Sequence, residues 1–145
     1  MDNSVDQQME HFSNILKRGD PLQRWKTVYL LENRLEAQTV VLLIFALADR
    51  NTTVRRSAAL ALALKNDKRA ITPLIASLKD KNVDVRWCVI HALSRCGDEQ
   101  ALPALEQIQA NDKSINHLKM RLGESATFAI ALIKQRQQTE MSSKK

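Results

Sequence analysis

DRNTTVRRSAALAL, residues 49–62, returns 31 positions later as DKNVDVRWCVIHAL, residues 80–93. The two stretches share an Asp, an Asn, a Val-Arg pair and an Ala-Leu pair at the same offsets, and the matches continue downstream. The residues of the first copy that recur in the second are Asp49, Asn51, Val54, Arg55, Ala61, Leu62, Asp67, Ala70 and Leu74. A repeat of this length is typical of arrays in which each unit is a pair of helices.

The same period reaches back toward the N-terminus with fewer identities. The matches one period before the first copy are Arg24, Leu31, Leu43, Ile44 and Leu47. An apolar stripe of the second helix recurs two periods earlier as Met9, Phe12 and Leu16. We therefore interpret residues 4–17 as the second helix of a truncated leading repeat.

Each unit contains two apolar stripes at helical spacing, separated by a turn at Asn66-Asp67 or Gly97-Asp98. A helix pair of this size cannot bury its stripe alone, whereas stacked pairs bury it continuously. The expected helices are 4–17, 21–34, 36–48, 52–65, 68–79, 83–96 and 99–110, with one or two closing helices around Gly123 that include Ile115 and Leu118.

These elements predict an all-α fold, a right-handed α-α superhelix of about three helical pairs plus capping helices. We expect a single domain over residues 1–136, with repeats at about 18–48, 49–79 and 80–111. Residues 137–145 carry no apolar stripe, so they are predicted to be a disordered tail.

The repeated motif resembles a known family. Asp-x-Asn-x-x-Val-Arg-x-x-Ala-x-x-Ala-Leu is present at 49–62 and, with Val89 for the first Ala, at 80–93. Together with Ala-(Ile/Leu)-x-x-Leu at 70–74 and 101–105, it resembles the HEAT-like repeats first noted in phycobilisome bilin lyases. The resemblance implies a helical solenoid whose second helices line the concave face. Proteins with such repeats include scaffolds, adaptors, lyase subunits and a few nucleic-acid enzymes.

Composition excludes several classes of protein. The longest apolar run, 40–48, is half of the roughly 18 residues that a membrane span needs. The first residues are acidic and polar, which does not fit a secretory signal. Cys88 and Cys96 lie about 12 Å apart along one predicted helix, too far for a disulfide. Free thiols without an export signal predict a cytoplasmic protein.

No catalytic, metal or cofactor site is predicted. His11, His91 and His117 lie on three separate elements, and none has a Cys or carboxylate beside it at metal-ligand spacing. The chain has no nucleophile elbow and no glycine-rich phosphate loop. We therefore expect a protein that is not an enzyme and that needs no cofactor.

The outward positions of the second helices are the predicted binding surface. In the later repeats these positions are small or polar, whereas Leu42 and Phe45 are large and apolar, and apolar groups left exposed favour a partner. The candidate partner-binding residues are Gln38, Val41, Leu42, Phe45, Arg69, Thr72, Ala76 and Gln107.

Two further sets of residues recur with the period. Arg24, Arg55 and Arg86 form either a basic ladder for an acidic ligand or, as we favour, ion pairs with turn carboxylates such as Asp49 and Asp80. The second set, one position later, is Trp25, Arg56 and Trp87. It suggests either a cation–π ladder across repeats, which we favour, or an outer-face aromatic binding patch.

The leading functional hypothesis is a non-catalytic adaptor, scaffold or chaperone-like module that binds a protein on its concave face, with a homodimer as a second arrangement. The first alternative is an accessory subunit of a bilin lyase, which the repeat resemblance permits. The second is a nucleic-acid binder, because the net charge is +6. The basic residues are scattered along the sequence, which argues against this second alternative.

Overall fold

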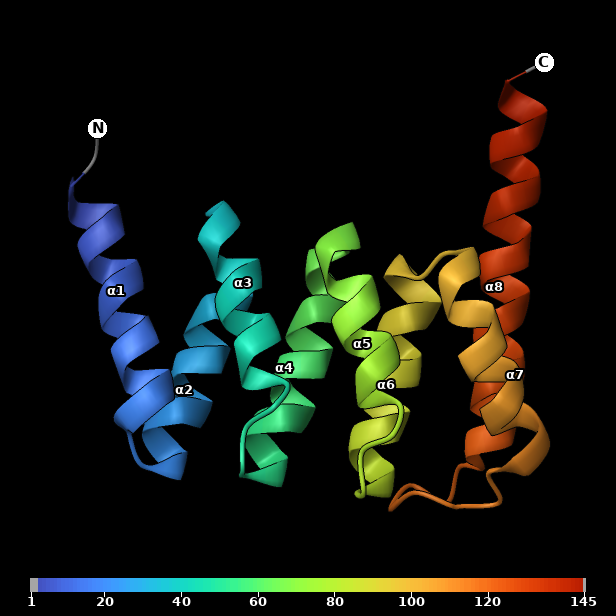
Figure 1. Cartoon of the computed structure of the whole chain (residues 1–145), viewed down its shortest axis with the longest axis horizontal. Coiled ribbons are helices and arrows are strands. Elements are labelled where there is room, and N and C mark those ends of the chain that lie inside the picture. The colour runs from blue at the N-terminus through green and yellow to red at the C-terminus, as the bar shows by residue number, and fades with distance from the viewer. Residues whose placement is uncertain (1–2, 145) are drawn as a thin grey trace.

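The computed structural model describes residues 3–144, and these form a row of eight α-helices in two layers (Figure 1). One layer consists of α2, α4, α6 and α8, and the other of α1, α3, α5 and α7. The helices are α1 (Asn3–Arg18), α2 (Pro21–Glu32), α3 (Ala37–Ala46), α4 (Thr52–Lys65), α5 (Ile71–Ser77), α6 (Val83–Cys96), α7 (Leu102–Asn111) and α8 (Leu122–Ser143). Short 3-10 turns, η1 (Lys68–Ala70) and η2 (Glu99–Ala101), lead into α5 and α7. The all-helical repeat solenoid predicted from the sequence is confirmed.

The recurring Asn of the motif begins the first helix of each central repeat. Asn51 accepts hydrogen bonds at Oδ1 from the backbone N–H groups of Thr53 and Val54. Asn82 does the same for Asp84 and Val85. A side-chain acceptor at this position satisfies amide groups that have no partner within the helix. The recurring Asn of the sequence therefore marks the residue at which each of these first helices begins.

The core is a continuous strip between the two layers. Its fully buried side chains come from successive repeats, and they include Leu31, Leu62 and Leu93 at the same position of three first helices. Along the stack α2 packs on α4, α4 on α6, and α6 on α8, while each second helix packs on the first helix that follows it. Each repeat therefore buries its stripe only with the help of its neighbours.

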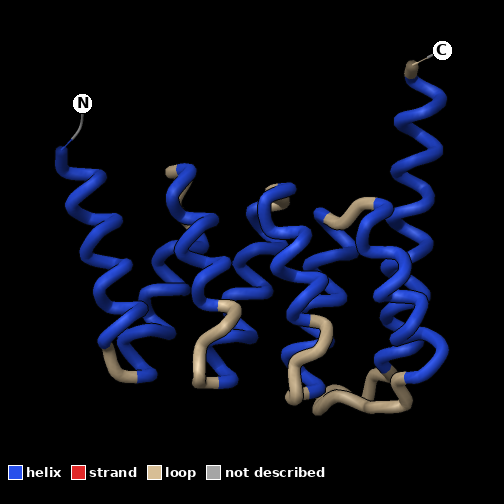
Figure 2. The backbone as a smooth tube through the Cα atoms, in the orientation of Figure 1, coloured by secondary structure: helices blue, strands red, loops and turns tan. Residues whose placement is uncertain are grey.

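The C-terminal part departs from the prediction in two ways. Ile115 and Leu118 were expected in a closing helix, but they lie in an irregular connection between α7 and α8 and are half exposed; the one closing helix, α8, is within the predicted number. An isolated antiparallel bridge joins Ile115 to Arg121 in that connection, and the rest of the described chain contains helices, turns and loops (Figure 2). The spacing of Ile115, Leu118 and Leu122 suggested a helix, but the segment hydrogen-bonds around Asn116 instead.

The expected disordered tail is also wrong for the described residues, because α8 continues to Ser143. Its last turns project beyond the neighbouring helices (Figure 1). The sequence there includes Gln137, Gln138, Glu140 and Met141, residue types that favour helix without an apolar stripe. The hydroxyl groups of Thr139 and Ser142 donate to carbonyl groups one turn back. Lys145 lies outside the described residues.

Candidate functional site

The three repeated arginines form buried ion pairs between adjacent repeats. Arg55 donates from Nε to Asp80 Oδ2 at 2.7 Å and from Nη2 to Asp80 Oδ1 at 3.1 Å. Arg24 pairs with Asp49 in the same two-point geometry, and Arg86 pairs with Asp112 and Ser114. We call these three pairs the ladder. Their formation confirms the structural interpretation of the arginines, and the first helix of each repeat is thereby tied to the next connection along the stack.

Two of the ladder carboxylates, Asp80 and Asp112, have a lowered pKa. Burial alone would raise the pKa of Asp80, but hydrogen bonds from Arg55 and the N–H of Asn82 outweigh burial and lower the pKa below its usual value. The pKa of Asp112 is lowered in the same way, against burial, by Ser114 and Arg86. The Arg55 side chain is 8% exposed and that of Asp80 10%. The guanidinium charge is therefore neutralised internally and is not available to a ligand.

The predicted cation–π ladder of Trp25, Arg56 and Trp87 is wrong. Trp25 stacks on Tyr29 at 6.3 Å, and Trp87 stacks on His91 at 6.0 Å, each one turn along its own helix. Among the described residues the one guanidinium found over a ring is that of Arg34, above Phe12. Side chains one turn apart on the same helix are neighbours, so each indole packs on a ring of its own helix rather than on a residue of another repeat.

Arg56 instead lies near Cys88 and Asp84. Burial raises the pKa of the Cys88 thiol, and the Arg56 guanidinium opposes this rise only in part. Cys88 and Cys96 are unpaired, as the sequence predicted, and both are buried. Since burial raises the pKa of both thiols, neither has the lowered pKa of a reactive cysteine.

The predicted binding residues lie as follows on the layer that contains α3, α5 and α7. Most of them are exposed: Gln38, Val41, Phe45, Arg69, Thr72, Ala76 and Gln107. Val41 and Phe45 expose 57% and 50% of their surface, a large value for apolar side chains. Leu42 is an exception because it is partly buried against the core. Arg69 is held by Asp67 at 2.8 Å.

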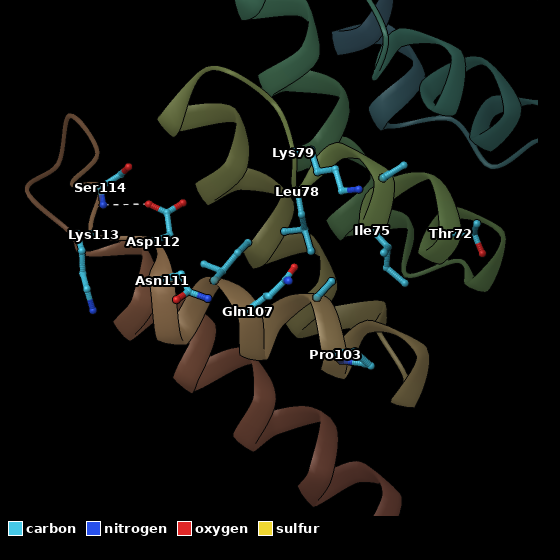
Figure 3. A pocket seen from close by; sticks show the side chains of 13 residues that line it. Thr72, Ile75, Leu78, Lys79, Pro103, Gln107, Asn111, Asp112, Lys113 and Ser114 are labelled. Carbon is cyan, nitrogen blue, oxygen red and sulfur yellow. Dashed lines mark hydrogen bonds between the residues drawn. The ribbon is translucent and has the colours of Figure 1, made fainter.

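A groove of about 1320 Å³ runs between α5 and α7 (Figure 3). It brings together three of the predicted residues, Thr72, Ala76 and Gln107. Ile75, Pro103, Ala104 and Ile108 also line it, and Lys79, Asp112, Lys113 and Ser114 lie at one end. Val41 and Phe45 on α3 and Arg69 in η1 are not part of the lining.

The groove follows from how the last helices pack. α7 packs mainly against α8 rather than against α5. Gly123 makes this approach close, since a Cβ at that position would lie 3.2 Å from the carbonyl oxygen of Gln109. Aligned by its buried stripe, α8 has Gly123 where α6 has Arg86, so the ladder ends there. Two lining residues were missed: Ile75 belongs to an apolar stripe that the sequence assigned to the core, and Ile108 was not singled out.

A second, smaller hollow of about 410 Å³ opens on the other layer, between α6, the α7–α8 connection and α8. Trp87, His91, Met120 and Phe128 line it. Within residues 3–144 no group of three His, Cys, Asp or Glu side chains could hold a metal ion. In the same part of the chain, no helix is both long and apolar enough to cross a membrane.

The geometry defines a class of protein, a helical-repeat solenoid with an open groove on one layer. A family model for HEAT repeats matches residues 39–125. The chain therefore belongs to the HEAT-repeat family, whose repeats are generally protein-interaction modules. A search of curated proteins finds no match.

Proposed function

We propose that this protein is a non-catalytic, cytoplasmic interaction module that holds a segment of a protein partner in the groove between α5 and α7. The observation that carries the proposal is the groove itself, which is open, continuous and lined by apolar and small side chains from two neighbouring second helices. Its volume of about 1320 Å³ exceeds the range of roughly 300–1,000 Å³ typical of small-molecule pockets. A helix or an extended peptide suits this shape better than a metabolite does.

The walls support the same occupant. Ile75 and Ile108 supply apolar contact, while Ala76 and Ala104 leave room for side chains from the partner. Gln107 and Thr72 are exposed and can hydrogen-bond to a peptide backbone. The ladder fixes the spacing of the repeats beneath the groove, so binding requires little reordering of the scaffold.

The proposal is tested by immobilising the protein and capturing its partners from the cytosol of the native host. Ala76 is exposed within the groove, and we expect Ala76→Arg to abolish capture of a discrete partner. Ala131→Arg is the matched control, because Ala131 is exposed on α8 away from the groove. Equal capture by both variants, with unchanged unfolding curves, would place the binding surface elsewhere.

Two other arrangements have their own tests. If Val41 and Phe45 instead mediate a homodimer, light scattering will give twice the chain mass, and Val41→Ser with Phe45→Ser will halve it.

The repeat motif also resembles that of phycobilisome lyases, and an accessory role in a bilin lyase is the alternative this resemblance suggests. Co-expression with a bilin source followed by an absorbance scan distinguishes it, since a pigment-bearing protein would favour the lyase role.

A further inference from the structure

One edge of the solenoid collects exposed basic side chains that are scattered in the sequence. The edge is formed by the four connections that lead from a second helix into the next first helix, at the bottom of Figure 1. Its exposed cations, which we call the basic edge, are Lys17, Arg18, Arg50, Lys79, Lys81, Lys113, Lys119 and Arg121. Lys17 and Arg18 come from the last turn of α1, and each of the other three connections contributes at least one of these bases.

Because of the ladder, the acidic groups on this edge are paired inside while the basic groups are exposed to solvent. In the turns Asp49-Arg50-Asn51 and Asp80-Lys81-Asn82 the carboxylate faces inward and pairs with a ladder arginine, while the base that follows is exposed. Asp112-Lys113-Ser114 repeats this arrangement. The ladder acids and ladder arginines cancel inside, and the bases between them remain in solvent.

The ladder also holds the backbone that carries these bases. Arg55 Nη1 donates to the carbonyl groups of Asp49 at 2.9 Å and Arg50 at 3.3 Å. Arg86 Nη1 donates to those of Asp80 and Lys81. The backbone of Arg50 and of Lys81 is therefore fixed in register with the repeat, and only the long side chain of each is free.

Few acids offset the basic edge. Asp20 is engaged in the cap of α2, Asp84 contacts His117, and Glu124 lies 3.8 Å from Arg121. By contrast, the opposite edge alternates acid and base, with pairs such as Arg34–Glu36 and Asp67–Arg69. The net charge of +6 is thus concentrated on one edge, which is the arrangement that favours a polyanion.

We propose that the basic edge binds the phosphate backbone of double-stranded nucleic acid, without reading its sequence. Stacked helices lie about 8–10 Å apart, so four connections span roughly 30 Å, close to one helical turn of a duplex. A duplex presents phosphates at regular intervals along this length, as the edge presents cations. The amide groups at the starts of α2, α4 and α6 are already capped by Asp20, Asn51 and Asn82, which leaves the contacts to side chains.

Two other polyanions fit the edge less well. Residues 17–20, 48–51 and 79–82 contain no aromatic side chain on which the bases of a single strand could stack, and the ring in the fourth connection, that of His117, is held by Asp84. The first three connections also contain no large apolar residue to form the centre of an interface with an acidic protein, since the exposed Ile115, Leu118 and Met120 all lie in the fourth connection.

Fluorescence anisotropy with labelled DNA and RNA duplexes of about two helical turns, in roughly 50–200 mM salt, tests the proposal. We expect binding that weakens steeply with salt. Arg50→Glu with Lys81→Glu should weaken it about tenfold or more and lower the slope of log affinity against log salt by roughly two. Lys68→Glu with Lys144→Glu changes the same charge away from the edge and should have a smaller effect. Whichever duplex binds more tightly identifies the natural form.

Several results would overturn the proposal. These are a duplex affinity weaker than about 10⁻⁴ M at the lowest salt, equal weakening by the two double variants, or tighter binding of a single strand. Equal competition by polyglutamate at the same charge concentration would assign the edge to acidic proteins instead. All four positions are exposed, so circular dichroism should confirm that each variant folds.

Discussion

The connection from α5 to α6 and the connection from α7 to α8 join the same kinds of helix by different means. In the first, a turn of a few residues is held by a buried ion pair, Arg55 with Asp80, that recurs along the stack. In the second, a longer segment lies between the helices and folds around the buried side chain of Asn116. Asn116 Oδ1 accepts the backbone N–H groups of Leu118 and Met120.

The second connection is also held from outside by a contact between His117 and Asp84, which we call the outer clasp. His117 contacts Asp84 on α6 through both its ring nitrogen Nδ1, at 2.6 Å, and its backbone N–H. The comparison shows that the ladder pair is present at both connections, because Arg86 holds Asp112 and Ser114 at the start of the second one. The longer second connection adds a buried side chain of its own, Asn116, which no repeat contains.

The largest expected effect is on the buried ladder. Arg55→Ala leaves the Asp80 carboxylate buried without its partner and should lower the free energy of unfolding by about 3–5 kcal/mol. Arg86→Ala should cost less, because the Arg86 and Asp112 side chains are more exposed. Urea unfolding of the two variants measures the difference. If Arg86→Ala proved the more damaging, stability would depend mainly on the closing connection.

Acid should affect both connections through their carboxylates. The pKa values of Asp80 and Asp112 are lowered in the folded protein, so both groups stabilise it fully above their unfolded pKa. This stabilisation is lost as the pH falls from about 4 through the lower folded values. The melting temperature should therefore be nearly flat near neutral pH and fall below about pH 4. In Asp80→Asn the fall should be shallower, and an unchanged profile would contradict the role of Asp80.

Asn116 should be the critical residue of the closing connection. Asn116→Ala removes a buried acceptor and leaves two backbone N–H groups without a partner, which should cost about 1–3 kcal/mol. Hydrogen exchange should accelerate at Leu118 and Met120 but not at Asn51 or Asn82. Equal acceleration at both connections would show that the two are not independent.

The outer clasp should have the smallest effect. His117 is 48% exposed, so Asp84→Asn should cost no more than about 1 kcal/mol. We expect faster exchange at His117 with little change in melting temperature. A loss as large as that of Asn116→Ala would mean that the clasp, and not the buried amide, holds the loop.

These two connections also show how far the sequence could predict the structure. The ladder was predictable, because Arg, Asp and Asn recur at fixed offsets and each offset has one geometric meaning. The Asn116 loop was not, since a single buried amide has no periodic signal and its apolar neighbours mimic a helix. The groove was predicted only in part. Thr72, Ala76 and Gln107 were named, but its opening depends on how closely α7 approaches α8, which Gly123 permits and which the repeated motif does not specify.

The central claim is that the repeated arginines stabilise the structure and do not bind a ligand. A double-mutant cycle on Arg55 and Asp80 tests this claim most directly. Urea unfolding of Arg55→Ala, Asp80→Ala and the double variant gives their coupling energy. We predict a coupling of about 2–3 kcal/mol, well above that of the exposed pair Arg69 and Asp67 measured in the same way. A coupling no larger than that of the exposed pair would contradict the ladder as the device that fixes the repeats.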